Sequence, residues 1–198
     1  MDNMGNDIRK IKFINILNLD TSIVEKIRQW RNSEDVRKYM YSSHYISKDE
    51  HAKWFESLKL KDTKRKVWVI FYEDIPVGVI NLINIDYENK STDWGFYIGE
   101  TVYRGLGIGS ISLYRLMEYV FDKMDFHKMY TSVLENNPDA LNLYKKFGFK
   151  EEGRLRKHIL KDEKYIDVFL IGILKEEWED IKNSLPIVNR IKESYEIE

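Results

Sequence analysis

Residues 104–110 read Arg-Gly-Leu-Gly-Ile-Gly-Ser, between a strand-like run and a long amphipathic segment. A glycine inside a regular element costs about 0.5–1 kcal/mol relative to alanine, so strand or helix preference does not account for three of them. They suit a place where the backbone turns tightly and approaches something closely. A helix that begins directly behind such a loop points its free amides at one spot, where the helix dipole favours negative charge. The stretch therefore predicts a phosphate-binding loop.

Two common phosphate-binding loops do not match this stretch. A P-loop carries Gly-Lys-Ser or Gly-Lys-Thr after its glycines, and neither follows here. A dinucleotide fingerprint needs Gly-x-Gly-x-x-Gly inside a parallel βαβ unit. Here the glycines run Gly-x-Gly-x-Gly and follow an apparent antiparallel meander. The loop therefore matches neither a P-loop nor a dinucleotide-binding loop well.

The composition predicts one globular domain with no attraction to polyanions. The 198 residues are 43% hydrophobic, and 32 basic side chains balance 33 acidic ones, so we expect neither a nucleic-acid nor a membrane partner. Met1–Lys10 lacks the apolar stretch of a signal peptide, and no apolar run reaches about 18 residues, which predicts a cytoplasmic protein. The chain has no cysteine, which excludes disulfides, thiolate metal sites and a thiol nucleophile. We expect a domain at residues 1–185, a tail at 186–198 and no metal.

Hydrophobic periodicity predicts a mixed α/β sheet with helices on both faces. A capping box, Ser47-Lys-Asp-Glu50, opens one helix, and Gly148 suits the end of another. Strands are expected at residues 11–17, 67–71, 77–85, 92–98, 129–134, 150–160 and 165–174. Helices are expected at residues 23–31, 47–58, 108–124, 137–148 and 176–184. The last two strands would leave an exposed sheet edge, which would suit a homodimer.

A second block reads Asn137-x-x-Ala-x-x-Leu-Tyr144-x-x-x-Gly-Phe149. Together with Arg104-x-x-Gly-x-Gly109, it resembles the two coenzyme motifs of the GNAT N-acetyltransferase superfamily. The resemblance covers roughly residues 11–174. It implies the GNAT acyl-CoA N-acyltransferase fold, with a largely antiparallel, seven-stranded central sheet, splayed strands and helices on both faces. It also implies acetyl-CoA as co-substrate and a small-molecule amine as acceptor.

The resemblance further implies which residues hold the coenzyme. The loop amides would bind the pyrophosphate, the strand before the loop would pair with the pantetheine arm, and the second block would hold the thiol end. A backbone N–H in that strand would stabilise the developing oxyanion. The residues concerned are Phe96, Tyr97, Ile98, Arg104, Gly105, Leu106, Gly107, Ile108, Gly109, Ser110, Asn137 and Tyr144.

Acetyl transfer to an amine also needs proton transfer. An alkyl amine with a pKa near 10.4 costs roughly 4 kcal/mol to deprotonate at pH 7, so a base is useful. Some relatives place a glutamate five residues before the second block, but Ser132 stands there. Others place an acid on the strand before the glycine loop, and Asp93 fits that slot, directly or through water. Tyr144 lies where relatives protonate the leaving thiolate. Asp93 also suits a solvated strand end, and Tyr144 a core position.

With no cysteine, an acetyl-cysteine intermediate is impossible, so we expect direct attack by the amine in a ternary complex. Residues 30–55 would shape the acceptor pocket, and they resemble the branch that acetylates nucleotide-linked amino sugars, in particular the 4-amino sugar of pseudaminic acid biosynthesis. Cationic side chains would pair with a nucleotide diphosphate, and aromatic rings would cover uracil or sugar faces. The residues singled out for the acceptor are Trp30, Arg31, Asn32, Arg37 and His51, with Lys38, Tyr39 and Trp54 beside them.

Several alternatives stay open. Branches that acetylate protein N-termini or aminoglycosides share the Trp-Arg-Asn opening. Trp30 and Trp54 also suit core packing, and His51 suits a helix start. A protein of another class, a non-catalytic acetyl-CoA-binding module, would carry the same coenzyme motifs. An acid at Asp93 and a tyrosine at position 144 favour the enzyme.

Overall fold

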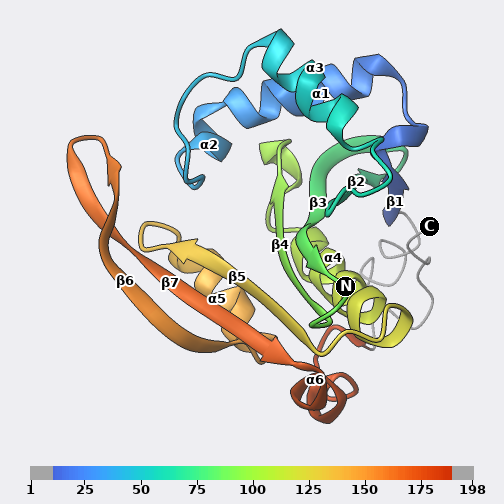
Figure 1. Ribbon diagram of the computed structural model, residues 1–198, viewed down its shortest axis with the longest axis vertical. Helices are drawn as coiled ribbons and strands as arrows, with labels where there is room; N and C mark the ends of the chain where they lie inside the picture. The colour runs from blue at the N-terminus through green and yellow to red at the C-terminus, as the bar shows by residue number, and fades with distance from the viewer. Residues whose placement is uncertain (1–10, 189–198) are drawn as a thin grey trace, which may run out of the picture.

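Seven strands form a single mixed sheet in a computed structural model, which describes residues 11–188 (Figure 1). The order across the sheet is β1-β2-β3-β4-β5-β7-β6, and only β4 and β5 run parallel. The strands are β1 (Ile11–Asn15), β2 (Lys66–Tyr72), β3 (Ile75–Asp86), β4 (Ser91–Ile98), β5 (Lys128–Leu134), β6 (Lys150–Lys161) and β7 (Lys164–Leu174). The helices are α1 (Thr21–Asn32), α2 (Glu34–Arg37), α3 (Lys48–Ser57), α4 (Ile108–Glu118), α5 (Pro138–Lys146) and α6 (Lys175–Ile181).

Helices cover both faces of the sheet because the central strands bury side chains on both sides. On β2, Val67 and Val69 belong to one core cluster with residues of α1, whereas Trp68 and Ile70 belong to a larger cluster with residues of α4 and α5. Successive side chains on a strand point to opposite faces, so this alternation sandwiches the sheet between the two helical layers. The fold expected from the resemblance is confirmed.

The parallel pair β4–β5 separates after three residues. The pairing runs from Ser91 opposite Lys128 to Asp93 opposite Tyr130 and stops there. Thr131 marks the point of separation, because its hydroxyl donates a hydrogen bond to the Trp94 carbonyl at 2.8 Å. The remainder of β4 therefore presents an edge with no strand beside it on the β5 side, and this splay creates the site described below (Figure 1).

The local signals of the sequence set most helix boundaries. The capping box forms, since Ser47 accepts from the Glu50 amide and the Glu50 carboxylate accepts from the Ser47 amide. Asn137 caps α5 by accepting from the Ala140 amide, and Gly148 ends it with a φ of 83°. These boundaries agree with the sequence-based expectation.

Three elements differ from that expectation. The first strand ends at Asn15, whose side chain accepts from the Leu17 amide and starts a 3-10 turn. The helix expected to reach Met124 changes at Tyr119 into a π-helical turn, which the Met124 amide closes on the Tyr119 carbonyl. The short helix α2 was not expected at all.

The core extends past the expected domain boundary at residue 185. Leu185 and Ile187 are both buried in the larger core cluster, so the packed chain reaches at least Val188. The rest of the expected tail, residues 189–198, lies outside the described part. Across residues 11–188, no helix has the length and apolar character needed to span a bilayer. The same residues contain no group of three or more His, Asp or Glu side chains arranged to hold a metal.

Candidate active site

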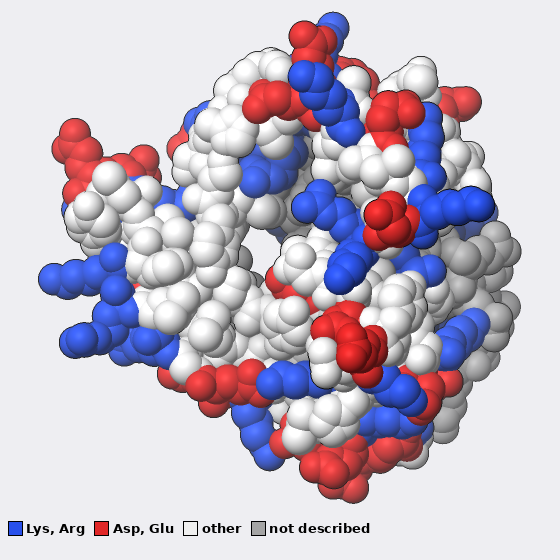
Figure 2. All heavy atoms as spheres, viewed as in Figure 1, with Lys and Arg blue, Asp and Glu red and all other residues white. Residues whose placement is uncertain are grey.

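A cleft of about 1110 Å³ occupies the space where β4 and β5 separate. One part is lined by the glycine loop, β4, β5 and α5, and the other by residues of α1, α2 and α3. In the space-filling view the molecule is open between its two halves, with basic side chains on the upper rim of the opening (Figure 2). The predicted coenzyme and acceptor regions thus meet in one continuous space.

The glycine loop needs its glycines for two different reasons. Gly105 and Gly107 have φ angles of 81° and 83°, in the left-handed region that other residues rarely adopt. Gly107 is the N-cap of α4, so the first amides of that helix face the cleft without intrahelical partners. At Gly109 the reason is space, because a Cβ there would lie 3.0 Å from the Phe96 ring, which would have to shift by a few tenths of an ångström. The loop can therefore offer several amides and a helix N-terminus to a phosphate group.

Arg104 is not directed at that phosphate position. Its guanidinium donates two hydrogen bonds to the Ile98 carbonyl, at 2.9 and 3.1 Å. Arg104 therefore ties the loop to the end of β4, and the backbone of the loop is what lines the cleft.

The free edge of β4 turns alternate backbone groups into the cleft. The Trp94 amide and carbonyl face β5, since they contact the Asp93 carboxylate and the Thr131 hydroxyl. The Gly99 amide faces the other way, to the Val77 carbonyl of β3. Backbone direction alternates along a strand, so the N–H and C=O groups of Phe96 and Ile98 face the gap, whereas those of Tyr97 face β3. Phe96 thus offers its N–H and C=O to a ligand, and Ile98 offers its N–H, because Arg104 already holds the Ile98 carbonyl.

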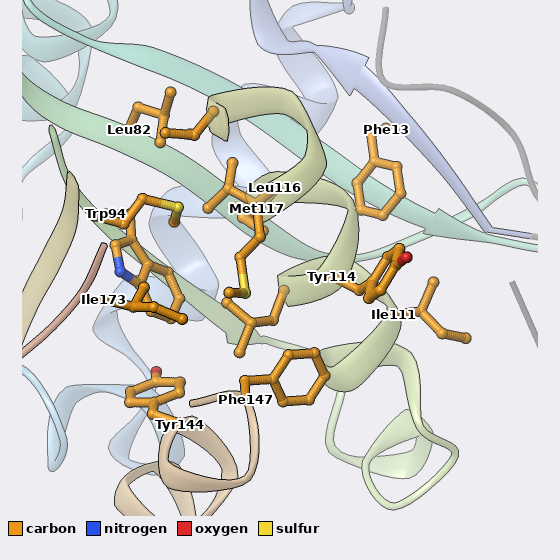
Figure 3. Packing of buried hydrophobic residues seen from close by; sticks show 14 of the residues in the cluster. Phe13, Leu82, Trp94, Ile111, Tyr114, Leu116, Met117, Tyr144, Phe147 and Ile173 are labelled. Atoms are coloured by element: carbon orange, nitrogen blue, oxygen red, sulfur yellow. The ribbon is translucent and has the colours of Figure 1, made fainter. Parts of the chain in front are cut away.

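Tyr144 reaches the cleft from α5 and lies among aromatic side chains. Its ring meets Trp94 edge-on, with ring centroids 4.9 Å apart, and Phe96 and Phe149 lie within 6.3 Å. Figure 3 shows Tyr144 beside Trp94, with its hydroxyl pointing away from α5. Burial raises the pKa of the Tyr144 phenol, so the group is protonated at neutral pH.

Asp93 lies on the opposite face of β4 from Trp94, at the point where the strands part. Its carboxylate accepts from the Trp94 amide at 2.6 Å, and the side chains of Thr131 and Asn84 lie against it. Burial raises the pKa of Asp93 above its usual value, while its contacts with the Trp94 amide and with the Thr131 and Asn84 side chains oppose the shift. A carboxylate with a raised pKa beside a cleft is suited to accept a proton.

Arg31 brings a positive charge into the acceptor part of the cleft, and no carboxylate of residues 11–188 forms an ion pair with it. Its Nη1 atom is buried and has no partner among residues 11–188. Nη2 makes a single long hydrogen bond, 3.5 Å, to the Ser42 carbonyl. Burial lowers the pKa of Arg31, and the charge lies close enough to Tyr97 to act on that phenol. A half-buried guanidinium in this state suits an anionic ligand.

His51 also lines the acceptor part of the cleft. Its ring lies 4.8 Å from the Trp54 ring, and its Nε2 atom is buried without a partner among the described residues. Burial lowers the pKa of His51, so the imidazole is neutral at pH 7. His51 follows the helix start but does not cap it, since Ser47 and Glu50 make the capping box.

Two of the predicted acceptor residues hold the fold instead of lining the cleft. Trp30 is buried in the core, and its Nε1 donates to the Glu100 carboxylate at 3.1 Å. Asn32 donates to the Ile46 carbonyl and accepts from the Ile46 amide, at 2.9 and 2.8 Å, so it anchors the loop before α3. The structure therefore does not bring these side chains to the ligand space.

Arg37 and Leu106 also lie outside the cleft lining. The Arg37 carbonyl accepts from the Lys161 ammonium at 3.3 Å, which ties α2 to β6. Leu106 is exposed at the tip of the glycine loop. The other predicted site residues, fourteen in all, do line the cleft: Arg31, His51, Asp93, Phe96, Tyr97, Ile98, Arg104, Gly105, Gly107, Ile108, Gly109, Ser110, Asn137 and Tyr144.

Sequence reasoning missed one polar residue of the cleft lining and one polar residue outside the lining that holds α2. Asn81 on β3 lines the cleft with a buried, unpartnered Oδ1 atom, and its signal is an amide at an inward position of an apolar strand. Lys161 on β6 is buried against α2, and its ammonium donates to the Ser43 hydroxyl at 2.8 Å. No local pattern connects Lys161 to a segment more than one hundred residues earlier.

Comparison with known proteins identifies the family. The family described as acetyltransferase (GNAT) domain matches residues 17–150, which is more than half of the chain. The chain belongs to the GNAT acetyltransferases. The family inferred from the two motif blocks is thereby confirmed, and with it acetyl-CoA as the acetyl donor.

Relatives of this GNAT acetyltransferase differ in their names. Acetyltransferase PseH of Campylobacter jejuni is 29% identical over 139 residues, which cover 70% of this chain and 84% of that protein. A spermidine N(1)-acetyltransferase of Vibrio cholerae is 27% identical over 152 residues, which cover 77% and 87%. A crystal structure of the Vibrio cholerae spermidine N-acetyltransferase in complex with CoA and spermine matches with a TM-score of 0.77 at 24% identity, covering 86% and 98% of the two chains. These matches support the fold and the acetyl transfer, and leave the acceptor to be argued from the site.

Proposed function

We propose that this GNAT enzyme transfers acetyl from acetyl-CoA to the amine of a nucleotide-linked sugar, most specifically the 4-amino group of a UDP-linked 4-amino-4,6-dideoxy sugar. The observation that carries the proposal is the unpaired charge of Arg31 in the acceptor part of the cleft. The likeness to PseH supports it.

The coenzyme would occupy the part of the cleft between the glycine loop and α5. The amides from Gly105 to Ser110 would bind its pyrophosphate, and the free edge of β4 at Phe96 and Ile98 would pair with the pantetheine amides. Asn137 and Tyr144 line the far end. This arrangement would direct the thioester to the point where β4 and β5 part.

The chemistry then needs two proton transfers. Asp93 would accept a proton from the attacking amine, directly or through water, and the Phe96 or Ile98 amide would stabilise the oxyanion. When the C–S bond breaks, Tyr144 would protonate the thiolate. Asp93 and Tyr144 reach the gap from opposite faces of β4. One side chain would therefore accept the proton of the amine while the other donates a different proton to the thiolate.

The charges around the acceptor favour an anion over a polyamine. A polyamine carries several positive charges and needs free carboxylates. Besides the proposed base Asp93, the carboxylates that line this part already have partners: Asp35 pairs with Lys38 at 3.3 Å, and Glu50 is held by the capping box and His44. Arg31 remains as a cation that no carboxylate in the described part of the chain pairs with. A phosphate group would supply the missing counter-charge.

An acceptor panel tests the proposal. Thiol release from acetyl-CoA is measured with the UDP-linked amino sugar, the same sugar without its nucleotide, spermidine, an aminoglycoside and a ribosomal N-terminal peptide. We expect the highest kcat/KM with the UDP-linked sugar. Faster turnover of spermidine or of the peptide would contradict the proposal, and coenzyme binding without any turnover would indicate a non-catalytic module.

A further inference from the structure

Asn81 presents a polar atom that the protein itself does not use. Its Oδ1 is buried and accepts no hydrogen bond from residues 11–188. Buried acceptors in native proteins are nearly always paired, with a protein group, a water or a ligand. Asn81 lines the cleft, so a ligand is able to supply the missing donor.

Asn81 faces the same side of the sheet as Asp93. Asn81 on β3 lies opposite Gly95 on β4, and Ile83 lies opposite Asp93. Residues two apart on a strand point to the same face, so Asn81, Gly95 and Asp93 share the face toward α1 and α3. Diagonal neighbours of this kind lie about 7–8 Å apart, which leaves room for one small group between the two side chains.

Gly95 keeps that space open. A Cβ at Gly95 would lie 3.5 Å from Asn81 Oδ1, and among residues 11–188 no other atom outside its chain neighbours would lie within 4 Å. A ligand atom above Gly95 is therefore within reach of the amide oxygen. The groups around this position are a carboxylate and an amide carbonyl, both hydrogen-bond acceptors. They suit a ligand group that carries two or more N–H donors.

We propose that Asn81 and Asp93 together hold the reacting amine of the acceptor. One N–H bond breaks and its proton goes to the Asp93 carboxylate. A second N–H donates to Asn81 Oδ1, which orients the nitrogen lone pair toward the thioester carbon. The new C–N bond forms, the C–S bond breaks and the thiolate takes its proton from the Tyr144 phenol, while Asp93 keeps the proton of the amine. The inference rests on the proposed function in one respect: the acceptor must be an amine, whether or not it is linked to a nucleotide.

The test compares Asn81→Leu, Asn81→Asp and the matched control Asn183→Leu at an exposed position. Each variant is assayed with whichever amine of the panel the wild type acetylates best, and its coenzyme affinity is measured separately. We expect Asn81→Leu to lower kcat/KM for the amine about tenfold or more, with coenzyme affinity unchanged, because the hydrogen bond that orients the reacting amine is lost and its N–H is left without an acceptor. Asn183→Leu should match the wild type.

The pH profile separates this role from a structural one. Asn81→Asp keeps an oxygen acceptor and places a second carboxylate near Asp93, which raises the pKa of the pair. We therefore expect the acid limb of kcat/KM to move to higher pH in Asn81→Asp and to stay in place in Asn81→Leu. Gly95→Ala, which fills the space but keeps both side chains, should raise the KM for the amine.

Equal kcat/KM in wild type and Asn81→Leu would overturn the inference, as would an unmoved acid limb in Asn81→Asp. If the wild type prefers spermidine, the proposed function fails while Asn81 is still tested on that amine. If no amine is turned over, the variants are compared by calorimetric binding of the amine in the presence of CoA, where equal affinities overturn the inference.

Discussion

The Tyr144 ring lies edge-on to the Trp94 indole, with centroids 4.9 Å apart and planes at 69°. This contact fixes a residue of α5 against β4, beside the gap between the splayed strands. Because Trp94 is fully buried, it gives Tyr144 a rigid support, and the position of the phenol is determined by packing.

Tyr144→Phe should keep this contact and remove only the hydroxyl. If the phenol protonates the thiolate, kcat should fall by about 10²-fold or more, with little change in coenzyme affinity or thermal stability. Steady-state kinetics and coenzyme titration check this. An unchanged kcat would rule out the acid role.

Asp93→Asn should remove the base. Burial raises the pKa of Asp93, and the group accepts a proton only when ionised, so wild-type kcat/KM should rise with pH through that elevated pKa. In Asp93→Asn, the rate should fall by about 10²-fold and the acid limb should disappear. A variant that retains the limb would show that another group titrates.

The order of the reaction is set by the absence of cysteine. With no thiol to carry the acetyl group, the amine should attack the thioester directly. Initial rates with both substrates varied should give intersecting lines, and labelled acetyl-CoA alone should leave no label on the protein. Parallel lines or a trapped acetyl-enzyme would contradict direct transfer.

Gly99 is expected to matter for stability because it packs against Trp30. A Cβ at Gly99 would lie 2.3 Å from Trp30 Cγ, and the indole is buried. Gly99→Ala should cost about 1–3 kcal/mol, or roughly 2–12 °C in Tm. Gly95→Ala is the matched control, with an ordinary 3.5 Å contact, and should lose no stability. Thermal unfolding measures the Tm of both variants. Equal Tm values would show that the contact between Gly99 and Trp30 does not limit the side chain at position 99.

The coenzyme part of the site was predictable because its signals are local. Gly105 and Gly107 indicate a backbone with positive φ, and the capping box indicates where a helix begins. The block from Asn137 to Phe149 predicts one face of a helix. Each depends on residues within about a dozen positions. The sequence therefore indicated the loop, helices α4 and α5 and the residues that face the cleft from them, apart from Leu106 at the exposed tip of the loop.

The acceptor part was less predictable because it depends on distant contacts. Asn32 looks like a binding residue, but its amide satisfies both backbone groups of Ile46, fourteen positions away. Trp30 also looks like a ligand-binding residue in the sequence, but in the structure its ring packs directly against Gly99. Asn81 joins the site only through the register of β3 against β4. Local sequence does not specify which side chains the tertiary fold uses for its own support.

Arg31 offers the most direct test of the central claim that the acceptor carries an anionic group. The measurement is the ratio of kcat/KM for the UDP-linked amino sugar to that for the same sugar without its nucleotide, in wild type, Arg31→Met and the exposed control Arg65→Met. We predict a large ratio in wild type and Arg65→Met and a fall of about tenfold or more in Arg31→Met, because a charge-assisted contact is lost. A ratio that Arg31→Met leaves unchanged, or a wild type indifferent to the nucleotide, would contradict the account.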